Sequence, residues 1–416
     1  MKSTQYNRRS GLFALAITVS LMAACGGGGG DTATDNSGEQ MPAPAPAPAP
    51  VAGDFVSKTD LTVVGATNAS STELIVYKMR GVDGELRDEQ AVVMLPTSAA
   101  PASGFPMVIW GHGTTGIGDS CAPSATNDLA GYAPYLNGLL AQGFAIVAPD
   151  YEGLGTPGLH HYLNLQSEGR SMLFAGLAAA NAYPNIALDY VTIGHSQGGH
   201  AALGAAELAS EVSALKLAGV VALAPASNVR AQGDQLAQAI VNPATPTDLR
   251  QAAAVGRVGF SALILAGLEA KMPSFDLPGA FGPDGQFLAQ AAVTQCTGAF
   301  FEGLEAPVET ALQNDGNVEA LLPESTTTDP DLLAYLTALE PGLLPISAPV
   351  LLVQGGLDTT VFPQSTQALE STYTAGGTTV TLSAYPTATH TSIVQASVNE
   401  VVTFIATQFG NAAAVQ

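Results

Sequence analysis

The chain has 416 residues, of which 47% are hydrophobic and 12% are charged, and its formal net charge is −22. This acidity excludes nucleic acid and anionic lipid surfaces as favoured partners, because both repel a negatively charged protein. The simplest explanation of the charge is solubility, and the length is sufficient for one large domain with an insertion.

Residues 1–24 predict a signal peptide. Basic residues precede an apolar run, Gly11–Ala24, which is shorter than the roughly 20 residues needed to span a bilayer. The run ends in LMAAC, which resembles the lipobox of bacterial lipoproteins, where the cysteine, here Cys25, carries the lipid. We therefore expect an exported protein that contacts the membrane of the bacterial cell envelope only through a lipid anchor, or otherwise a secreted one.

Residues 25–50 predict a linker. They combine the stretch GGGGGDTATDNSGEQ, which is flexible, with PAPAPAPAP, which favours an extended spacer. Neither stretch can bury a core, so the folded part is expected to begin near Val51.

Short apolar runs alternate with helical segments through most of the remaining chain. A strand pair with a turn at Asp83 and Gly84 comes first, and six apolar runs follow it: Pro106–Trp110, Gly143–Pro149, Tyr190–Gly194, Leu217–Pro225, Ala348–Gly355 and Val380–Pro386. Helices are expected between them, at Ser171–Asn181 and Gly198–Ser210, and after them at Ser392–Phe409. Strands that are apolar throughout and separated by helices predict an α/β fold with a mostly parallel sheet covered on both faces.

One interval interrupts this alternation. Residues 226–345 are rich in Leu, Ala, Phe and Pro and contain no clear strand. They predict a largely helical cap inserted into a core that is made of residues 51–225 and 346–416.

The stretch GHSQG, Gly194–Gly198, matches the pattern G-x-S-x-G. In this pattern the serine lies on a sharp turn between a strand and a helix, where the strained backbone exposes its hydroxyl and only small residues two positions away avoid a clash. The helix N-terminus also offers amide donors for developing negative charge. Since the chain supplies both the strand and the helix, we predict that Ser196 is a nucleophile. The alternative is an ordinary serine in a Gly-rich turn.

The base is predicted by elimination among six histidines. In enzymes with this turn the acid and then the base follow the serine in the chain, and only His200 and His390 do so. His200 lies about one turn into the helix and points along its surface, while His195 adjoins the serine and projects elsewhere. His390 lies in a polar loop after the last predicted strand, at the sheet edge where a base is needed. We predict His390 as the base, and a solvated loop histidine is the alternative.

The acid should follow a strand between the serine and the base. Asp358 lies in a short Gly turn after an apolar strand, in LLVQGGLDTTV. One strand earlier the sequence offers Asn228, whose amide cannot stabilise an imidazolium as a carboxylate does. We therefore predict Asp358 as the acid.

The stretch VIWGHGTTGIG predicts an oxyanion site. A His-Gly pair after the third strand of such sheets turns the chain so that the next backbone amide faces the substrate. The predicted donors are the amides of Thr114 and of Gln197, with Gly113 as the alternative to Thr114. A phosphate-binding loop is the competing hypothesis, but the pattern G-x-x-x-x-G-K-[ST] is missing from the sequence.

The other histidines predict no metal site. His112 is expected to hold its loop through hydrogen bonds. His160 and His161, in GTPGLHHY, are expected to line a groove or the surface, because no further ligands occur at a recognisable spacing.

Two cysteines remain besides the lipobox cysteine. Cys121 and Cys296 could form a disulfide that ties a loop to the inserted segment, as is common in exported proteins. Two buried free thiols are the alternative.

Taken together, these motifs resemble an α/β-hydrolase, and more closely the secretory lipase family of the Candida lipase A type with its bacterial relatives. The resemblance extends from about Val51 to the C-terminus and rests on five stretches beyond the catalytic residues: HGTTG, CAPS (Cys121–Ser124), DYEGLG (Asp150–Gly155), GHSQGG and GGLDTTV. The family pattern places the nucleophile on Ser196, the acid on Asp358 and the base on His390.

The resemblance implies hydrolysis of carboxylic esters, acylglycerols included, through an acyl-enzyme and without a cofactor, and a helical cap that forms the acyl pocket. An amide, peptide or polyester hydrolase with the same triad is the alternative enzyme. A lipid-binding surface protein on an inactive scaffold is the alternative outside enzymes, and the complete set of Ser196, Asp358 and His390 argues against it.

Overall fold

The computed structural model describes residues 49–410, except 284, 315–317 and 323–329. The predicted signal peptide, the predicted lipidation site Cys25 and nearly all of the predicted linker lie outside the described residues.

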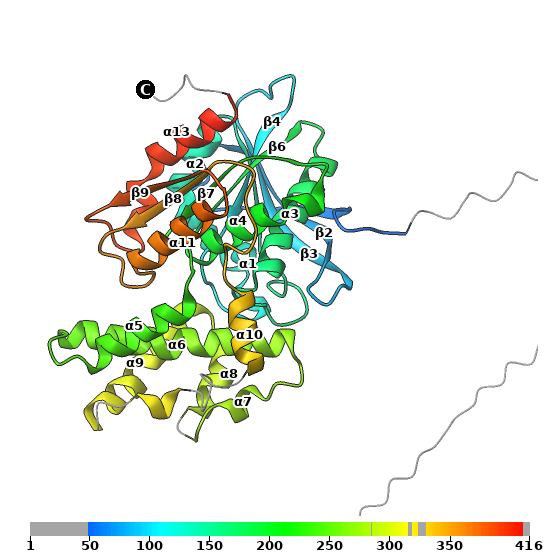
Figure 1. The fold of residues 1–416 in the computed structure, drawn as a ribbon. Helices are drawn as coiled ribbons and strands as arrows, with labels where there is room; N and C mark the ends of the chain where they lie inside the picture. Colours follow the sequence, from blue (N-terminus) through cyan, green and yellow to red (C-terminus); the bar gives the residue numbers. More distant parts are fainter. Residues whose placement is uncertain (1–48, 284, 315–317, 323–329, 411–416) are drawn as a thin grey trace, which may run out of the picture. The chain divides into compact units, whose positions relative to one another are not determined.

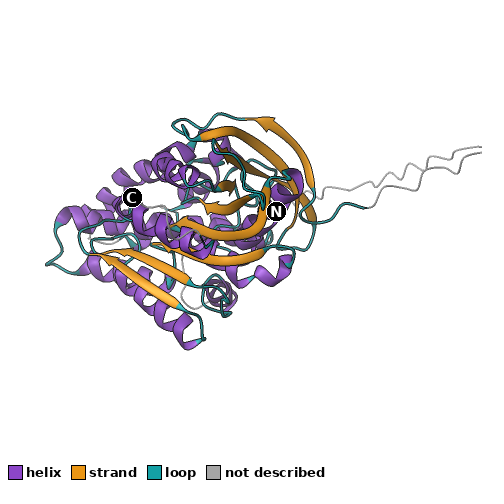
Figure 2. Ribbon diagram, turned by 90° about the horizontal axis from the view of Figure 1, so that it is seen from above, coloured by secondary structure: helices purple, strands orange, loops and turns teal. Residues whose placement is uncertain are grey.

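The described strands form one sheet (Figures 1 and 2). In chain order they are β1 (Phe55–Asp60), β2 (Ala69–Arg80), β3 (Leu86–Pro96), β4 (Phe105–Gly111), β5 (Ala145–Pro149), β6 (Ile186–His195), β7 (Lys216–Leu223), β8 (Val350–Gly355) and β9 (Val380–Tyr385). Their order in the sheet is β1-β2-β3-β5-β4-β6-β7-β8-β9. Neighbouring strands in the part β1-β2-β3-β5 pair antiparallel. Neighbouring strands in the part β5-β4-β6-β7-β8-β9 pair parallel. The predicted α/β class is confirmed, and β1 is a strand that the sequence analysis did not predict.

The central strands are apolar throughout because both of their faces are buried. In β4, Met107 and Ile109 join the core on one face of the sheet, whereas Val108 and Trp110 join the core on the other. Successive side chains of a strand point to opposite faces, so a strand covered on both sides requires an apolar residue at every position.

Helices cover both faces (Figure 2). Outside the insertion they are α1 (Pro123–Thr126), α2 (Ala133–Ala141), α3 (Leu165–Ala182), α4 (Gln197–Glu207), α11 (Pro363–Ala375), α12 (Ser392–Ala396) and α13 (Val398–Gln408). Helices α3, α4 and α11 bury apolar residues against one face, and α2, α12 and α13 against the other. The expected single helix Ser392–Phe409 is two helices, which meet at Ser397. Its hydroxyl donates a hydrogen bond of 2.8 Å to the Ile393 carbonyl oxygen, a local bond that competes with regular helix.

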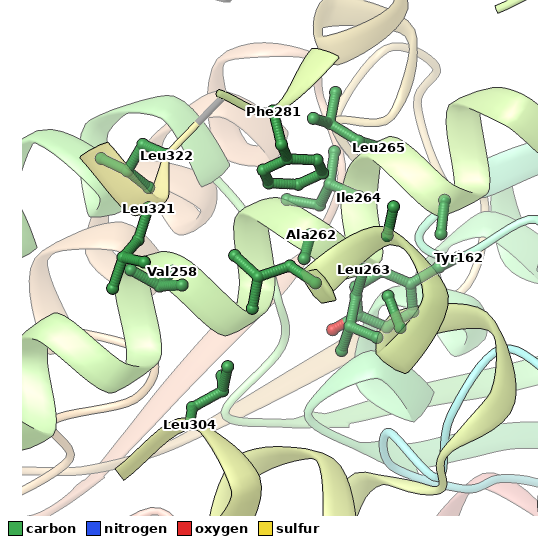
Figure 3. Close-up of a cluster of buried hydrophobic side chains, with 14 of the residues drawn as sticks. Tyr162, Val258, Ala262, Leu263, Ile264, Leu265, Phe281, Leu304, Leu321 and Leu322 are labelled. Atoms are coloured by element: carbon green, nitrogen blue, oxygen red, sulfur yellow. The ribbon is translucent and has the colours of Figure 1, made fainter. Parts of the chain in front are cut away.

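The interval between β7 and β8 is helical and has an apolar core of its own (Figures 1 and 3). Its α-helices are α5 (Val229–Val241), α6 (Thr247–Lys271), α7 (Leu277–Ala280), α8 (Gln286–Thr294), α9 (Thr297–Asn314) and α10 (Pro330–Ala338). Helix α6 is the one described helix that is long and apolar enough to cross a membrane, and 61% of its apolar window is buried. Side chains such as Val258, Leu263 and Leu265 pack in this core, which accounts for the apolar composition of α6. These helices are called the cap below.

Candidate active site

Ser196 occupies the sharp turn between β6 and α4. Its φ of 59° and ψ of −120° lie in a region that non-glycine residues rarely adopt, which is the strained geometry expected of a nucleophile turn. The two flanking glycines are needed for close packing. A Cβ added to Gly194 would lie 2.1 Å from the Gly198 carbonyl oxygen, and one added to Gly198 would lie 2.0 Å from that of Gly111. The motif therefore lets the ends of β4 and β6 and the start of α4 meet.

The buried Asp358 and the partly buried His390 form a pair after the ends of β8 and β9. The Nδ1 of His390 donates to Oδ2 of Asp358 over 2.7 Å. The other carboxylate oxygen, Oδ1, accepts hydrogen bonds of 2.8 Å from the backbone amides of Thr360 and Val361. Asp358 is 3% exposed. The turn after β8 thus fixes one carboxylate oxygen and presents the other to the imidazole.

Ser196 and His390 line the same cleft, together with Thr114, Tyr132 and Thr297. Within the described residues no hydrogen bond joins the serine hydroxyl to the imidazole. Catalytic hydrogen bonds are often long before substrate binds and tighten in the complex. The structure therefore brings the three predicted catalytic side chains to one edge of the sheet, where parallel strands place their carboxyl ends.

Of the two predicted oxyanion donors, one follows Ser196 directly and the other lines the cleft. Gln197 is the first residue of α4, where backbone amides have no partner within the helix, and Thr114 lies in the cleft wall after β4. The Thr114 hydroxyl lies 3.0 Å from that of Tyr162. Gly113 lines the same wall, so both predicted alternatives face the cleft.

The cap holds in place the loop after β4 that carries the predicted donor Thr114, called the oxyanion loop below. Cys121 and Cys296 are joined by a disulfide. The backbone amide of the next residue, Thr297, donates to the Thr115 carbonyl oxygen over 2.8 Å. The Thr297 hydroxyl donates to the Thr114 carbonyl oxygen over 3.0 Å. A covalent bond and two hydrogen bonds therefore connect the start of α9 to the loop.

A buried ion pair lies beneath the serine turn. His200 donates from Nδ1 to Glu168 over 2.7 Å and from Nε2 to the Leu339 carbonyl oxygen over 2.7 Å. Since both oxygens only accept, both ring nitrogens carry protons. Burial by itself raises the pKa of Glu168, but the charge of His200 and its hydrogen bond outweigh it and hold that pKa at about 2. Glu168 also accepts from the Gln197 side chain over 2.8 Å, so the pair anchors the residue that follows Ser196.

Replacing Glu168 by glutamine is expected to lower the free energy of unfolding by about 3 to 5 kcal/mol, because it leaves His200 buried without its counter-charge. The matched control is Glu211→Gln. Glu211 forms an ion pair with Arg170, which lies on the same helix as Glu168. This pair is more exposed, so a loss of at most about 1 kcal/mol is expected. Urea unfolding at about pH 5.5 measures both variants.

The effect of Glu168→Gln should depend on pH. The lowered pKa of Glu168 stabilises the fold above the ordinary value of 4.5, and this contribution is lost as the pH falls toward 2. The pKa of His200 is raised: burial opposes the charge, but Glu168 favours it more strongly. Its contribution is complete below the ordinary value of 6.5 and is lost as the pH rises through the raised value. The difference between wild type and variant should therefore be largest between these limits, and a difference that stays constant with pH would contradict the assignment.

The remaining predicted histidines occupy buried positions near the site. His112 lies with Nδ1 2.7 Å from the Gly113 carbonyl oxygen and Nε2 3.2 Å from that of Asp150, and burial lowers its pKa to about 4. His160 donates from Nδ1 to the Glu152 carbonyl oxygen over 2.9 Å, and its Nε2 accepts from the side-chain amide of Gln197 over 2.7 Å. His160 and His161 are both buried, so the expected groove or surface location is wrong for them. Among the described residues no group of three or more metal-ligating side chains occurs.

Three residues that contribute to the site were not predicted from the sequence. Glu168 is an isolated acidic residue in an Ala-rich, apolar helix, and that contrast was a usable signal. Tyr132, which lines the cleft, and Thr297, which holds the oxyanion loop, carried no signal, because their roles depend on partners that are distant in the chain.

Comparisons with known proteins agree with this architecture. A model of the alpha/beta hydrolase family matches residues 108–399. No protein of curated function shows significant sequence similarity to the chain. Among solved structures, lipase A of Candida antarctica in its closed state is similar over 88% of this chain and 84% of its own, with 18% identity and a TM-score of 0.68. The rice cell wall degrading esterase LipA of Xanthomonas oryzae is similar over 86% and 98%, with 18% identity and a TM-score of 0.67. At such identities the likeness shows a shared fold.

Proposed function

The chain belongs to the alpha/beta hydrolase family, and from that premise we propose that it is a carboxylic ester hydrolase that works through a Ser-Asp-His triad. One observation carries the proposal. Ser196, in the strained turn after β6, opens on the same cleft as His390, and His390 is hydrogen-bonded to the buried carboxylate of Asp358.

The reaction follows from these positions. Ser196 transfers its hydroxyl proton to Nε2 of His390 while its Oγ attacks the ester carbonyl carbon. The carbonyl oxygen becomes an oxyanion, which accepts hydrogen bonds from the backbone amides of Thr114 and Gln197. His390 then gives the proton to the departing alkoxide, which leaves as the alcohol. A water molecule then attacks the acyl-enzyme in the same way: His390 takes a proton from the water and passes it to the Ser196 oxygen, which releases the acid and restores Ser196. Throughout, Asp358 stabilises the imidazolium.

Two cavities that both include Ser196 suggest which part of the ester lies where. A cavity of about 100 Å³ runs from Ser196 between α5 and α6, among side chains such as Leu236, Phe260 and Ile264. The cleft that contains His390 measures about 450 Å³ and includes the polar side chains of Asp128 and Thr391. Because the base must protonate the leaving group, the alcohol part belongs beside His390. The acyl part then belongs in the smaller, apolar cavity.

We therefore propose that the substrates are esters with a short or medium acyl chain and a bulkier, more polar alcohol. This is a narrower substrate class than the hydrophobic esters and acylglycerols expected from the sequence. The Xanthomonas structure is that of a cell wall degrading esterase, and an alcohol group borne on a large molecule is compatible with the open cleft here.

A series of p-nitrophenyl esters from acetate to palmitate, with triolein and a polyester film beside it, tests the proposal. We expect kcat/KM to be highest for short to medium acyl chains and to fall for palmitate, because the apolar cavity is small. A maximum at palmitate or triolein would contradict the cavity assignment. A p-nitroanilide tests amide hydrolysis, and binding of fatty acid without turnover of any ester would favour the non-catalytic alternative.

Export is part of the proposal as well. The Cys121–Cys296 disulfide suits an oxidising compartment outside the cytosol. Mass spectrometry of the mature protein is expected to find Cys25 lipid-modified at the N-terminus. An unmodified Cys25 preceded by residues 1–24 would contradict export, and cleavage without lipid would indicate secretion.

A further inference from the structure

His195, the residue before the nucleophile, contacts the loop that carries the base. Its ring lies 4.6 Å from the ring of His390, centroid to centroid. Its Nε2 lies 2.8 Å from the backbone carbonyl oxygen of His390, and its Nδ1 lies 3.3 Å from the hydroxyl of Tyr132. His195 is 5% exposed, so water does not compete freely for these contacts.

The partners of His195 define its protonation state. A carbonyl oxygen can only accept, so Nε2 of His195 carries a proton and donates it to His390. In a neutral ring Nδ1 is then an acceptor, and the Tyr132 hydroxyl donates to it. Burial, with a smaller effect from His390, lowers the pKa of His195 to about 3, and burial raises the pKa of the Tyr132 hydroxyl. Both shifts favour the neutral ring and the protonated phenol that this arrangement needs.

Neither nitrogen of His195 is therefore free to take the proton of Ser196, which agrees with the prediction that His195 is not the base. Other bonds hold the residues on either side of His390 in this loop: the carbonyl oxygen of the buried Ala388 accepts from the Leu357 amide over 2.9 Å, and the Thr389 amide donates to the Ser392 hydroxyl over 2.8 Å. Pro386, Thr387 and Thr389 are exposed, and Asp358 is the one hydrogen-bond partner of the His390 side chain among the described groups. The hydrogen bond from His195 fixes the backbone of His390.

We propose that His195 is a positioning residue for the base: its Nε2–H, held in that tautomer by Tyr132, fixes the backbone of His390 beside Ser196. The inference rests on the proposed function, in which His390 deprotonates Ser196. His195 and Ser196 are consecutive residues at the end of β6, so the contact ties the base directly to the strand that presents the nucleophile. A displacement of a reacting group by about 1 Å can cost on the order of 100-fold in rate.

The test compares His195→Gln, His195→Asn and His195→Phe. The terminal nitrogen of glutamine occupies the place of Nε2 and can donate to the His390 carbonyl oxygen, whereas that of asparagine occupies the place of Nδ1 and cannot reach it. Phenylalanine keeps the ring but offers no donor. With p-nitrophenyl butyrate we expect kcat to fall on the order of 10- to 100-fold in the Asn and Phe variants. In the Gln variant kcat should stay within about fivefold of wild type, and KM should change by less than about threefold in all three.

A packing role would give a different result, because Phe would then resemble wild type and Gln would resemble Asn. Equal kcat in the Gln and Asn variants, or unchanged kcat in the Phe variant, would overturn the proposal. Thermal unfolding checks that each variant folds, and if the Phe variant does not, the Gln and Asn pair still decides.

Two readouts separate this inference from the proposed function. Absence of ester hydrolysis and of fluorophosphonate labelling at Ser196 in wild type would refute the proposed function. Nitrogen NMR of the imidazole rings tests His195 independently of activity. A neutral ring protonated at Nε2 is expected near neutral pH, and a cationic ring or one protonated at Nδ1 would overturn the inference.

Discussion

Ser196→Ala is expected to lower kcat for p-nitrophenyl butyrate by on the order of 10⁴- to 10⁶-fold, because the acyl-enzyme cannot form without the hydroxyl. The backbone of residue 196 keeps its place, since alanine adds no atoms to the turn. Thermal unfolding should therefore resemble that of wild type or show a slightly more stable protein, as the strained residue loses only an oxygen.

The matched control is Ser261→Ala. Ser261 lines the small cavity beside Ser196 but has no part in the proposed chemistry, so its loss should leave kcat within the same order of magnitude. A fluorophosphonate probe should label wild type and the control at Ser196 and should leave Ser196→Ala unlabelled. Substantial activity in Ser196→Ala would remove Ser196 as the nucleophile.

Asp358→Asn is expected to lower kcat by on the order of 10⁴-fold, as such a change does in other triads. The geometry gives the reason. The amides of Thr360 and Val361 both donate to Oδ1, so the asparagine oxygen is held there and its NH₂ group faces Nδ1 of His390. That nitrogen must then accept, which moves the ring proton to Nε2, where it prevents His390 from receiving the proton of Ser196.

Asp128→Asn is the control for this change, because Asp128 lines the same cleft without contacting His390 among the described groups. It should retain most of the kcat of wild type at neutral pH. The rate of Asp358→Asn should rise at higher pH if hydroxide assists the reaction in place of the base. A loss of less than about tenfold in Asp358→Asn would contradict its role as the acid.

The sequence predicted much of the fold and the identity of the three candidate catalytic side chains. Strands buried on both faces need apolar residues at every position, so they were visible as short runs such as Tyr190–Gly194. Strand β1 has an exposed residue at each of its six positions, so it lacked that pattern and was missed. The histidine choice also followed from chain order, since the strand order of this fold fixes which loops reach the serine.

The arrangement around those side chains could not be predicted in the same way. The sequence indicated that His195 is not the base, but it gave no sign of the hydrogen bond to His390, which spans 195 residues. The contact between Thr297 and Thr114 spans 183 residues, and the ion pair of Glu168 and His200 joins two helices.

A turn, a buried strand or a helix is specified by residues that are neighbours in the chain, so it produces a local sequence pattern. A hydrogen bond between distant residues leaves no such pattern, because either partner would be acceptable in many other surroundings. The sequence by itself therefore determined the architecture and pointed to Ser196, Asp358 and His390. Only the tertiary structure decided how the base and the oxyanion loop are held, since packing of the sheet and the cap selects those partners.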